Sequence, residues 1–277
     1  MAAALPFHIC DVFTTGESLS GNQLLVVEDV DEILSDASMQ AIASEIGFAE
    51  SAFIRNGNVV HIFTTDEEVP QAGHPIIGLS EIMGGETLCE LELFTRKGPI
   101  RTWPGEVKGT WWASQDPPEW LGDVARSSVA ALLRGSAEVV GDSFPVGSTC
   151  GLPYALVPVP SEAELDALVV DPSAPCDALG GNSVYFYART GEASCRTRMF
   201  CHEGGRWIED VATGSAAGPL ACHLAPLKGT FTQGSSRRAT IHVKSTSREG
   251  CRVEIGGSVR RVAEGKWRAP GGGHSSG

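Results

Sequence analysis

Short apolar runs, some alternating with polar residues, mark the strands that the sequence predicts. In the first part of the chain they lie at residues 7–13, 24–27, 51–55, 59–64, 91–94 and 109–113. In the second part they lie at residues 154–159, 182–189, 195–200, 240–243, 251–255 and 259–262. A period of two, or a short apolar run bounded by turn residues, is typical of a strand. Both parts are therefore expected to be rich in β-sheet.

Apolar positions three and four residues apart predict a helix that begins at Ser35 or Asp36 and ends at Gly47. Two other segments, 76–83 and 216–224, are apolar around most of their circumference, so each should form a helix buried on most sides. Shorter helices are expected around residues 124–133 and, after the capping box at 161–164, up to about residue 169.

The same order of elements occurs twice along the chain. Each part reads as strand, helix, β-hairpin, acidic loop, buried helix entered through a glycine, and further strands. An internal duplication of about 130 residues explains this order, and chance recurrence of common elements is the alternative. We therefore expect two similar halves, residues 1–118 and 119–277, with a disordered tail at 271–277.

The charge of the chain limits its partners. The sequence has 21 Lys and Arg against 34 Asp and Glu, a net charge of 21 − 34 = −13. Nucleic acid and anionic membrane surfaces are therefore not expected as partners, because phosphate binding needs a basic surface. A small anionic substrate needs only one locally positive pocket. No apolar run approaches the roughly 18 residues of a membrane span, and the N-terminus lacks the basic region of a secretory signal, so a cytoplasmic protein is expected.

The chain has eight cysteines, none of them in C-x-x-C spacing. Cys201-His202 and Cys222-His223 match no structural zinc pattern, so no metal site is expected. The cysteines are interpreted as reduced, mostly buried thiols.

Two helix starts are candidates for binding an anion. Gly73-His74 and Gly214-Ser215 each open one of the buried apolar helices, and glycine lets a ligand approach the backbone closely. The free N–H groups of a helix N-terminus attract anions. If the two termini face one cleft, they would hold a carboxylate. The alternative is that both are ordinary capped helix starts.

The sequence also offers candidates for proton transfer. Glu45 is predicted at the rim between the core and the cleft and in the last turn of the first helix, where the helix dipole disfavours a carboxylate and raises its pKa. A solvated surface glutamate is the alternative. His74 and Asp210 could form a second proton carrier with its partner or serve as capping groups. Ser215 could donate a hydrogen bond or act as an N-cap.

Four segments resemble the phenazine-biosynthesis, PhzF-like isomerase family. They are GNQLLVVED (21–29), MQAIASEIGFAESAFI (39–54), TDEEVPQAGHPIIG (65–78) and IEDVATGSAAGPLACHL (208–224). The resemblance covers nearly the whole chain, and the order and spacing of the motifs are specific. It implies the diaminopimelate-epimerase fold of class α+β, in which two pseudo-symmetric halves each wrap a sheet around a central helix. It also implies an active site between the halves, a homodimer, and no metal or redox cofactor.

The resemblance also implies roles for particular residues. The positions that match the catalytic residues of the family are Glu45, His74, Asp210 and Ser215. Glu45 would give or take the migrating proton, while His74 and Asp210 shape the pocket. The substrate carboxylate would be held by the helix-start amides of Gly73, His74, Gly214 and Ser215.

The sequence departs from the family pattern at positions near the expected cleft, among them Gln23, Gln71, Ile76 and Val211. We therefore expect a small unsaturated cyclic amino or carboxylic acid as substrate, in a secondary-metabolite (antibiotic-type) pathway, without assigning the phenazine intermediate. Two alternatives remain. A racemase or epimerase on this fold would use two thiols, but the corresponding positions are Ala72 and Ala212. A binding protein without chemistry is the other alternative.

Overall fold

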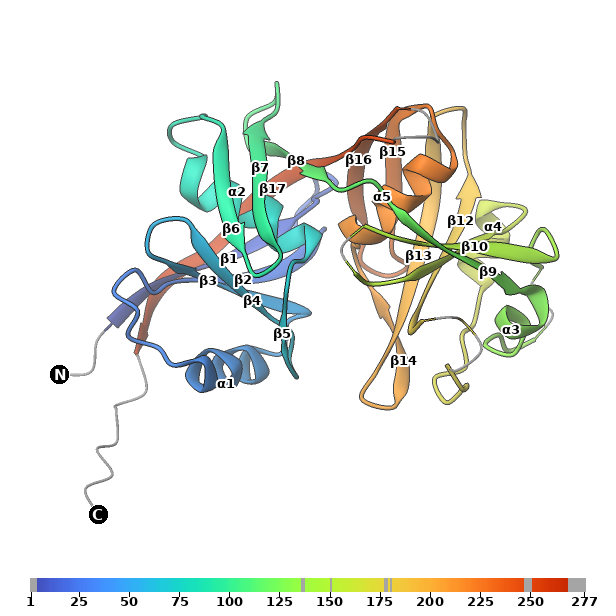
Figure 1. The fold of residues 1–277 in the computed structure, drawn as a ribbon, viewed down its shortest axis with the longest axis horizontal. Coiled ribbons are helices and arrows are strands. Elements are labelled where there is room, and N and C mark those ends of the chain that lie inside the picture. Colours follow the sequence, from blue (N-terminus) through green and yellow to red (C-terminus); the bar gives the residue numbers. More distant parts are fainter. Residues whose placement is uncertain are drawn as a thin grey trace, which may run out of the picture.

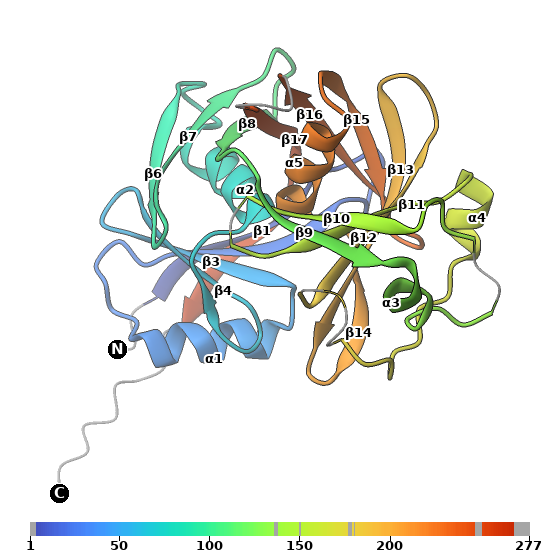
Figure 2. The same cartoon turned by 45° about the vertical axis from the view of Figure 1, so that its right-hand side comes forward.

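The computed structural model describes residues 4–135, 138–149, 151–176, 179, 181–246 and 251–268. It consists of two halves that lie side by side, each built from a curved sheet around one helix (Figure 1). The expected tail at 271–277 lies outside the described residues. Turning the molecule shows that the helices α2 and α5 lie inside the two sheets, whereas α1, α3 and α4 lie outside them (Figure 2).

The first half is a closed ring of strands around α2 (Gly73–Gly84). In order around the ring, the strands are β1 (Ala4–Val12), β2 (Asn22–Glu28), β3 (Glu50–Arg55), β4 (Val59–Phe63), β6 (Leu91–Thr95), β7 (Gly98–Pro104), β8 (Thr110–Gln115) and β17 (Val253–Arg268). The short β5 (Glu68–Val69) pairs with β4 just before α2 begins.

The second half repeats this plan around α5 (Gly214–His223). Its strands are β9 (Glu119–Ala125), β10 (Ser143–Ser148), β11 (Tyr154–Pro158), β12 (Ser183–Arg189), β13 (Ser194–Glu203), β15 (Leu227–Gln233), β16 (Ala239–Ser245) and the start of β17. β14 (Arg206–Asp210) pairs with β13 and leads into α5, as β5 leads into α2.

Equivalent connections in the two halves confirm the repeated element order. β2 and β3 pair in parallel across α1 (Asp36–Ile46), and β11 and β12 pair in parallel across α4 (Glu162–Ala167). A parallel pair requires such a crossover. α1 has the predicted ends: the Ser35 hydroxyl accepts a hydrogen bond from the Ser38 N–H, and Gly47 ends the helix with φ +69°.

β17 changes the predicted division of the chain at residue 118. Its first residues pair with β16 and β8, but from Val259 onward it pairs with β1. The C-terminal strand thus completes the first half, so residues 119–277 do not all belong to the second. The helix predicted at 124–133 is also shorter than expected. Because residues 119–125 pair with β10, only α3 (Arg126–Ala130) is helical.

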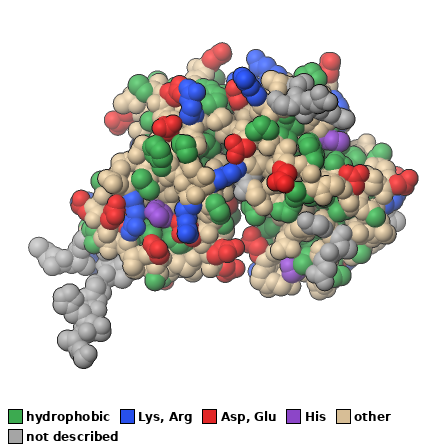
Figure 3. All heavy atoms as spheres, viewed as in Figure 1, with side chains coloured by type: hydrophobic (Ala, Val, Ile, Leu, Met, Phe, Trp, Pro, Cys, Tyr) green, Lys and Arg blue, Asp and Glu red, His purple; other side chains and the backbone are tan. Residues whose placement is uncertain are grey.

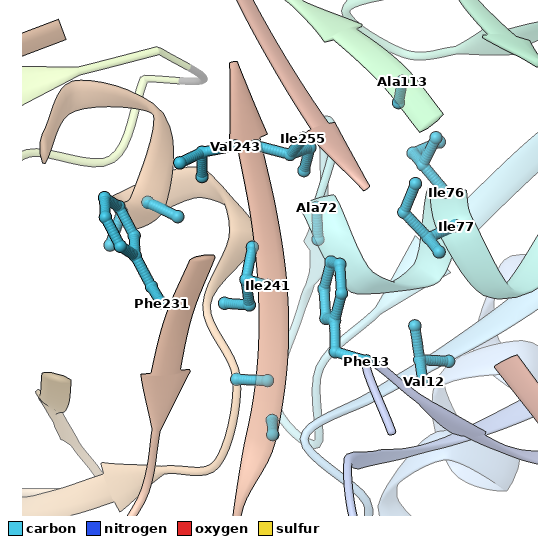
Figure 4. Close-up of a cluster of buried hydrophobic side chains, with 14 of the residues drawn as sticks. Val12, Phe13, Ala72, Ile76, Ile77, Ala113, Phe231, Ile241, Val243 and Ile255 are labelled. Atoms are coloured by element: carbon cyan, nitrogen blue, oxygen red, sulfur yellow. The ribbon is translucent and has the colours of Figure 1, made fainter. Parts of the chain in front are cut away.

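The helices α2 and α5 are buried as their apolar circumference predicts. A methyl group added at Gly78 of α2 would meet the Leu24 side chain at 2.4 Å, so this helix and the sheet are in close contact. Figure 4 shows part of the core, with Ile76 and Ile77 of α2 among side chains from the first half and Phe231, Ile241 and Val243 in the second. This packing fixes the start of each helix relative to its sheet.

The interpretation that all cysteines are reduced is wrong for one pair. Cys222, near the end of α5, forms a disulfide with Cys251, just before β17. The two positions are 29 residues apart in the sequence, and only the fold brings them together. Among the described residues, no helix is both long and apolar enough to cross a membrane.

Candidate active site between the two halves

A cavity of about 290 Å³ lies where the two halves meet. The first half contributes the start of β3, the loop between β4 and β5, and the start of α2. The second half contributes β13, β14 and the start of α5. Figure 3 shows acidic side chains on both sides of the notch between the halves. The predicted location of the site between the halves agrees with this cavity.

The starts of α2 and α5 touch each other at the cavity. A methyl group added at Gly73 would lie 3.0 Å from the Gly214 Cα and 3.1 Å from the Ser215 amide nitrogen. Neither helix start is capped by a side chain: the N-cap residues are Ala72 and Thr213. The uncapped starts of both helices thus lie together at one cavity, and helix dipoles make such a place attractive to an anion.

From the sequence, Ser215 could donate a hydrogen bond or act as the N-cap of α5, and the structure shows that it is not the N-cap. The N-cap position is occupied by Thr213, two residues earlier. The Ser215 hydroxyl instead forms a 2.7 Å hydrogen bond with the Tyr154 hydroxyl, and both residues line the cavity. The serine can therefore present its hydroxyl to a ligand with an orientation set by Tyr154.

The structure does not place Glu45 at the cavity. Its side chain is exposed on α1, which packs against the outside of β3 and β4, and Glu45 does not line the cavity. The prediction that Glu45 lies at the edge of the cleft is wrong because the polar face of α1 points to solvent. The nearby glutamate that does line the cavity is Glu50, the first residue of β3.

Glu50 has the surroundings of a proton-transfer group. Its carboxylate oxygen Oε2 lies 3.4 Å from His74 Nδ1, and its side chain is 20% exposed. Burial raises the pKa of Glu50 well above 4.5, and the negative charges of Asp210 and Glu203 raise it further. A carboxyl group with a raised pKa is suited to general acid/base work near neutral pH.

The sequence contains a signal for Glu50 that the helix-based argument missed. Residues 51–54 of β3 are buried, and Glu50 is the charged residue at the start of this strand. Its partner in the parallel pairing is Leu24 in β2. A charge at the end of a buried strand reaches a cavity only if the strand ends there, which depends on the tertiary fold.

His74 and Asp210 lie at the cavity as predicted, one from each half. His74 is buried, and burial lowers its pKa to about 3, although the nearby backbone of Gln23 opposes the shift. The imidazole is therefore neutral at physiological pH. Burial raises the pKa of Asp210, while hydrogen bonds from Thr213 and Asn22 to its carboxylate oppose this.

The electrostatics of the cavity are unusual for a site expected to take an anion. No Lys or Arg is among the described residues that line it, whereas the lining includes the acidic side chains of Glu50, Asp66, Glu67, Glu203, Glu209 and Asp210. Positive potential at the cavity thus comes from the helix starts. A ligand with both a carboxylate and a cationic group would match this combination.

The remaining predicted positions are also at the cavity. Its lining includes Gly73, Gly214, Ala72 and Ala212. Among the described residues, no cluster of three or more His, Cys, Asp or Glu side chains has the geometry to hold a metal ion.

Comparison with known proteins identifies relatives of the chain. A family model for phenazine biosynthesis-like protein matches residues 10–265. The trans-2,3-dihydro-3-hydroxyanthranilate isomerase of Pseudomonas aeruginosa is 37% identical over 229 residues, which cover 79% of each chain.

Solved structures show the same fold. A PhzF-family phenazine biosynthesis protein from Bacillus anthracis superposes with a TM-score of 0.80 at 21% identity, over 96% of this chain and 99% of that one. A probable proline racemase from Agrobacterium radiobacter superposes with a TM-score of 0.58 at 13% identity, over 94% of this chain and 92% of that one. The fold is thus the expected diaminopimelate-epimerase-like one.

Proposed function

The chain belongs to the phenazine biosynthesis-like protein family and is an isomerase, and from this premise we propose that it moves a proton and a double bond within a small unsaturated cyclic amino or carboxylic acid. We assign the general acid/base role to Glu50 instead of Glu45. The observation that carries this assignment is the place of Glu50 in the cavity, beside His74 and opposite Asp210.

The proposed reaction is a proton shuttle that leaves the composition of the substrate unchanged. The Glu50 carboxylate removes a proton from a saturated carbon next to a double bond. The electron pair of the broken C–H bond forms a new double bond, and the old double bond shifts its electrons toward its far carbon. The Glu50 carboxylic acid then returns the proton to that far carbon. The raised pKa of Glu50 favours both transfers, because acid and base forms are then both accessible.

The helix starts stabilise the charge that builds up in this reaction. If the double bond is conjugated to a carboxylate, proton removal places additional negative charge on the carboxylate oxygens. The free N–H groups at Gly73, His74, Gly214 and Ser215 would bind these oxygens. His74, neutral and buried, and the Ser215 hydroxyl would complete the polar wall.

The relative from Pseudomonas aeruginosa suggests where to look for the substrate. Its name gives trans-2,3-dihydro-3-hydroxyanthranilate as the compound on which it acts. We propose a compound of this kind, with a carboxylate for the helix starts and an amino group for the acidic wall, in a phenazine or related secondary-metabolite pathway. Among the departures at Gln23, Gln71, Ile76 and Val211, Gln71 lines the cavity whereas Ile76 is buried in the core, so Gln71 is placed to alter substrate choice.

The proposed function is tested by incubation in deuterated water. The purified protein is given trans-2,3-dihydro-3-hydroxyanthranilate and other unsaturated cyclic amino acids, with the Pseudomonas aeruginosa enzyme as the positive control. We expect an isomer that either gains one deuterium from solvent or retains its own hydrogen at the new carbon, as read by mass spectrometry and NMR. If every compound stays unchanged while the control turns over, the proposed substrate class is wrong.

We also propose a homodimer, on the family resemblance alone. Light scattering coupled to size-exclusion chromatography measures the mass in solution. A mass of one chain at micromolar concentration would contradict the proposal.

A further inference from the structure

The side chain of Asn22 links the two halves directly beneath the cavity. Asn22 is the first residue of β2 in the first half and is 5% exposed. Its amide nitrogen Nδ2 donates one hydrogen bond to Asp210 Oδ1 at 2.9 Å and one to the Ala212 carbonyl at 3.3 Å. Both acceptors belong to the segment that leads into α5. Asn22 does not line the cavity, so it acts on a ligand only through these partners.

The backbone around Asn22 is held from both halves. Gly21 has φ +80°, and a methyl group there would lie 2.4 Å from the Val12 carbonyl oxygen, so the turn before Asn22 requires glycine. The Gly21 N–H donates to the Arg238 carbonyl at 2.8 Å, and Arg237 Nε donates to the Gly21 carbonyl at 2.5 Å. The amide of Asn22 therefore has a fixed position before any ligand binds.

The network around Asp210 leaves its carboxylate little freedom. Oδ1 accepts from Asn22, and Oδ2 accepts from the Thr213 hydroxyl. Gln233 Nε2 in turn donates to the Asp210 carbonyl at 3.0 Å and to the Thr213 hydroxyl at 2.9 Å. By contrast, within the described part of the chain the Glu50 carboxylate has one polar side-chain contact, with His74 Nδ1 at 3.4 Å. The two carboxylates therefore differ: Asp210 is fixed, whereas Glu50 is free to exchange a proton.

We propose that Asn22 is a positioning residue of the isomerase, which holds Asp210 and the first turn of α5 at a fixed place opposite Glu50. This inference rests on the proposed function, because Asp210 and the α5 start act in catalysis only if the cavity is the active site. The side-chain amide of Asn22 is uncharged and supplies two N–H donors. One donor serves the Asp210 carboxylate and the other serves the neighbouring Ala212 carbonyl.

Replacing Asn22 by aspartate tests this role with almost no change in shape. In Asn22→Asp, a second carboxylate faces Asp210, and the two cannot both be charged at hydrogen-bonding distance. When the pair takes up a proton, an O–H group again donates across the contact. The other ionisable groups around this pair include Glu50, Tyr185, Cys201 and Glu203, with His74 at the same cavity and Arg237, paired with Asp11, on the side of Asn22. Because they are common to variant and wild type, activity is expressed as a ratio to wild type at each pH.

Three variants are compared with wild type in the isomerisation assay: Asn22→Ala, Asn22→Asp and Asn58→Ala. Asn58 is the matched control, because its amide also donates to a backbone carbonyl, that of Glu92, but lies in an exposed turn. We expect Asn22→Ala to lower kcat/KM about ten- to hundredfold, mainly through kcat, as the loss of a hydrogen bond to a charged group predicts. Asn58→Ala should stay within about twofold. The kcat/KM of Asn22→Asp should be low relative to wild type at pH 8, and this ratio should rise at least about tenfold by pH 5.5.

A measurement without substrate separates failure of this inference from failure of the proposed function. The carboxyl carbon of Asp210 is followed by ¹³C NMR during a pH titration and assigned with Asp210→Asn. In folded Asn22→Ala, the pKa of Asp210 should be higher than in wild type, because a donor to its charged form is lost. An unchanged pKa of Asp210 in Asn22→Ala would overturn the positioning role. Wild-type kcat/KM in Asn22→Ala, together with an activity of Asn22→Asp whose ratio to wild type does not change with pH, would also overturn it. Inactive wild type with a shifted Asp210 titration would instead contradict the proposed function alone.

Discussion

The contact between the starts of α2 and α5 predicts that Gly73→Ala separates the two helix ends. The added methyl group would meet three backbone atoms of the facing helix start, at 3.0, 3.1 and 3.2 Å. Ordinary van der Waals contact begins at about 3.4 Å, so the helix starts must move apart by a few tenths of an ångström. Backbone atoms cannot rotate away as the end of a flexible side chain can. The whole helix start therefore has to shift.

The size of the effect follows from the kind of atom that has to move. Overpacking of a well-packed interior costs about 1–3 kcal/mol, and we expect Gly73→Ala to lie in this range. A displacement of about 1 Å in a catalytic arrangement can cost about a hundredfold in rate, so a shift of a few tenths should lower kcat about tenfold. Gly214→Ala is the comparison, because the atom nearest to its methyl group is Cδ1 of the Ile255 side chain, at 2.7 Å. This side chain can adopt another rotamer.

Urea unfolding and steady-state kinetics on both variants measure these effects. Gly73→Ala should lose stability and kcat together, and Gly214→Ala should lose less of both. Wild-type stability and kcat in Gly73→Ala would refute the claim that the two helix starts are in close contact. A larger loss in Gly214→Ala than in Gly73→Ala would show that the side-chain contact matters more than the backbone contact.

Three further predictions follow from the site and its surroundings. The raised pKa of Glu50 means that the unfolded chain loses this proton first as pH rises above about 4.5, so the folded state loses stability as pH rises toward the folded pKa. Glu50→Gln should therefore gain stability over wild type as pH rises above 4.5 in urea unfolding, and a pH-independent difference would count against the raised pKa. Reduction of the Cys222–Cys251 disulfide should lower the free energy of unfolding by about 3–4 kcal/mol, because the bond closes a 29-residue loop. Alkylation of both thiols in the absence of a reductant would exclude the bond. With Ala72 and Ala212 in place of thiol bases, the protein should not invert L-proline, as followed by polarimetry; inversion would revive the racemase alternative.

The fold could be predicted from local patterns because those patterns repeat. The apolar circumference of the segments that became α2 and α5 indicated central helices, and the N-cap at Ser35 and the C-cap at Gly47 fixed the ends of α1. Long-range pairing could not be predicted. Nothing local in residues 259–268 shows that they return to pair with β1, since that choice depends on which sheet edge is free.

The sequence predicted the site residues whose role follows from the backbone, such as those at the helix starts. It missed the residues whose role depends on the direction of a side chain. The glycine-led helix starts and His74 lie at the cavity as their positions predicted. The helix dipole that favours Glu45 can be judged from the sequence, whereas the direction of the Glu50 side chain at the start of a strand depends on how the sheet curves. The Asn22–Asp210 contact spans 188 residues and has no local signal.

The central claim is that Glu50, and not Glu45, carries the migrating proton. The direct test compares kcat of Glu50→Gln and Glu45→Gln on the same substrate, with each fold checked by circular dichroism. Removal of a general acid/base costs about a hundred- to ten-thousandfold, so Glu50→Gln should lose at least about a hundredfold in kcat, while Glu45→Gln stays within about twofold of wild type. Full activity in Glu50→Gln, or a loss confined to Glu45→Gln, would contradict the assignment.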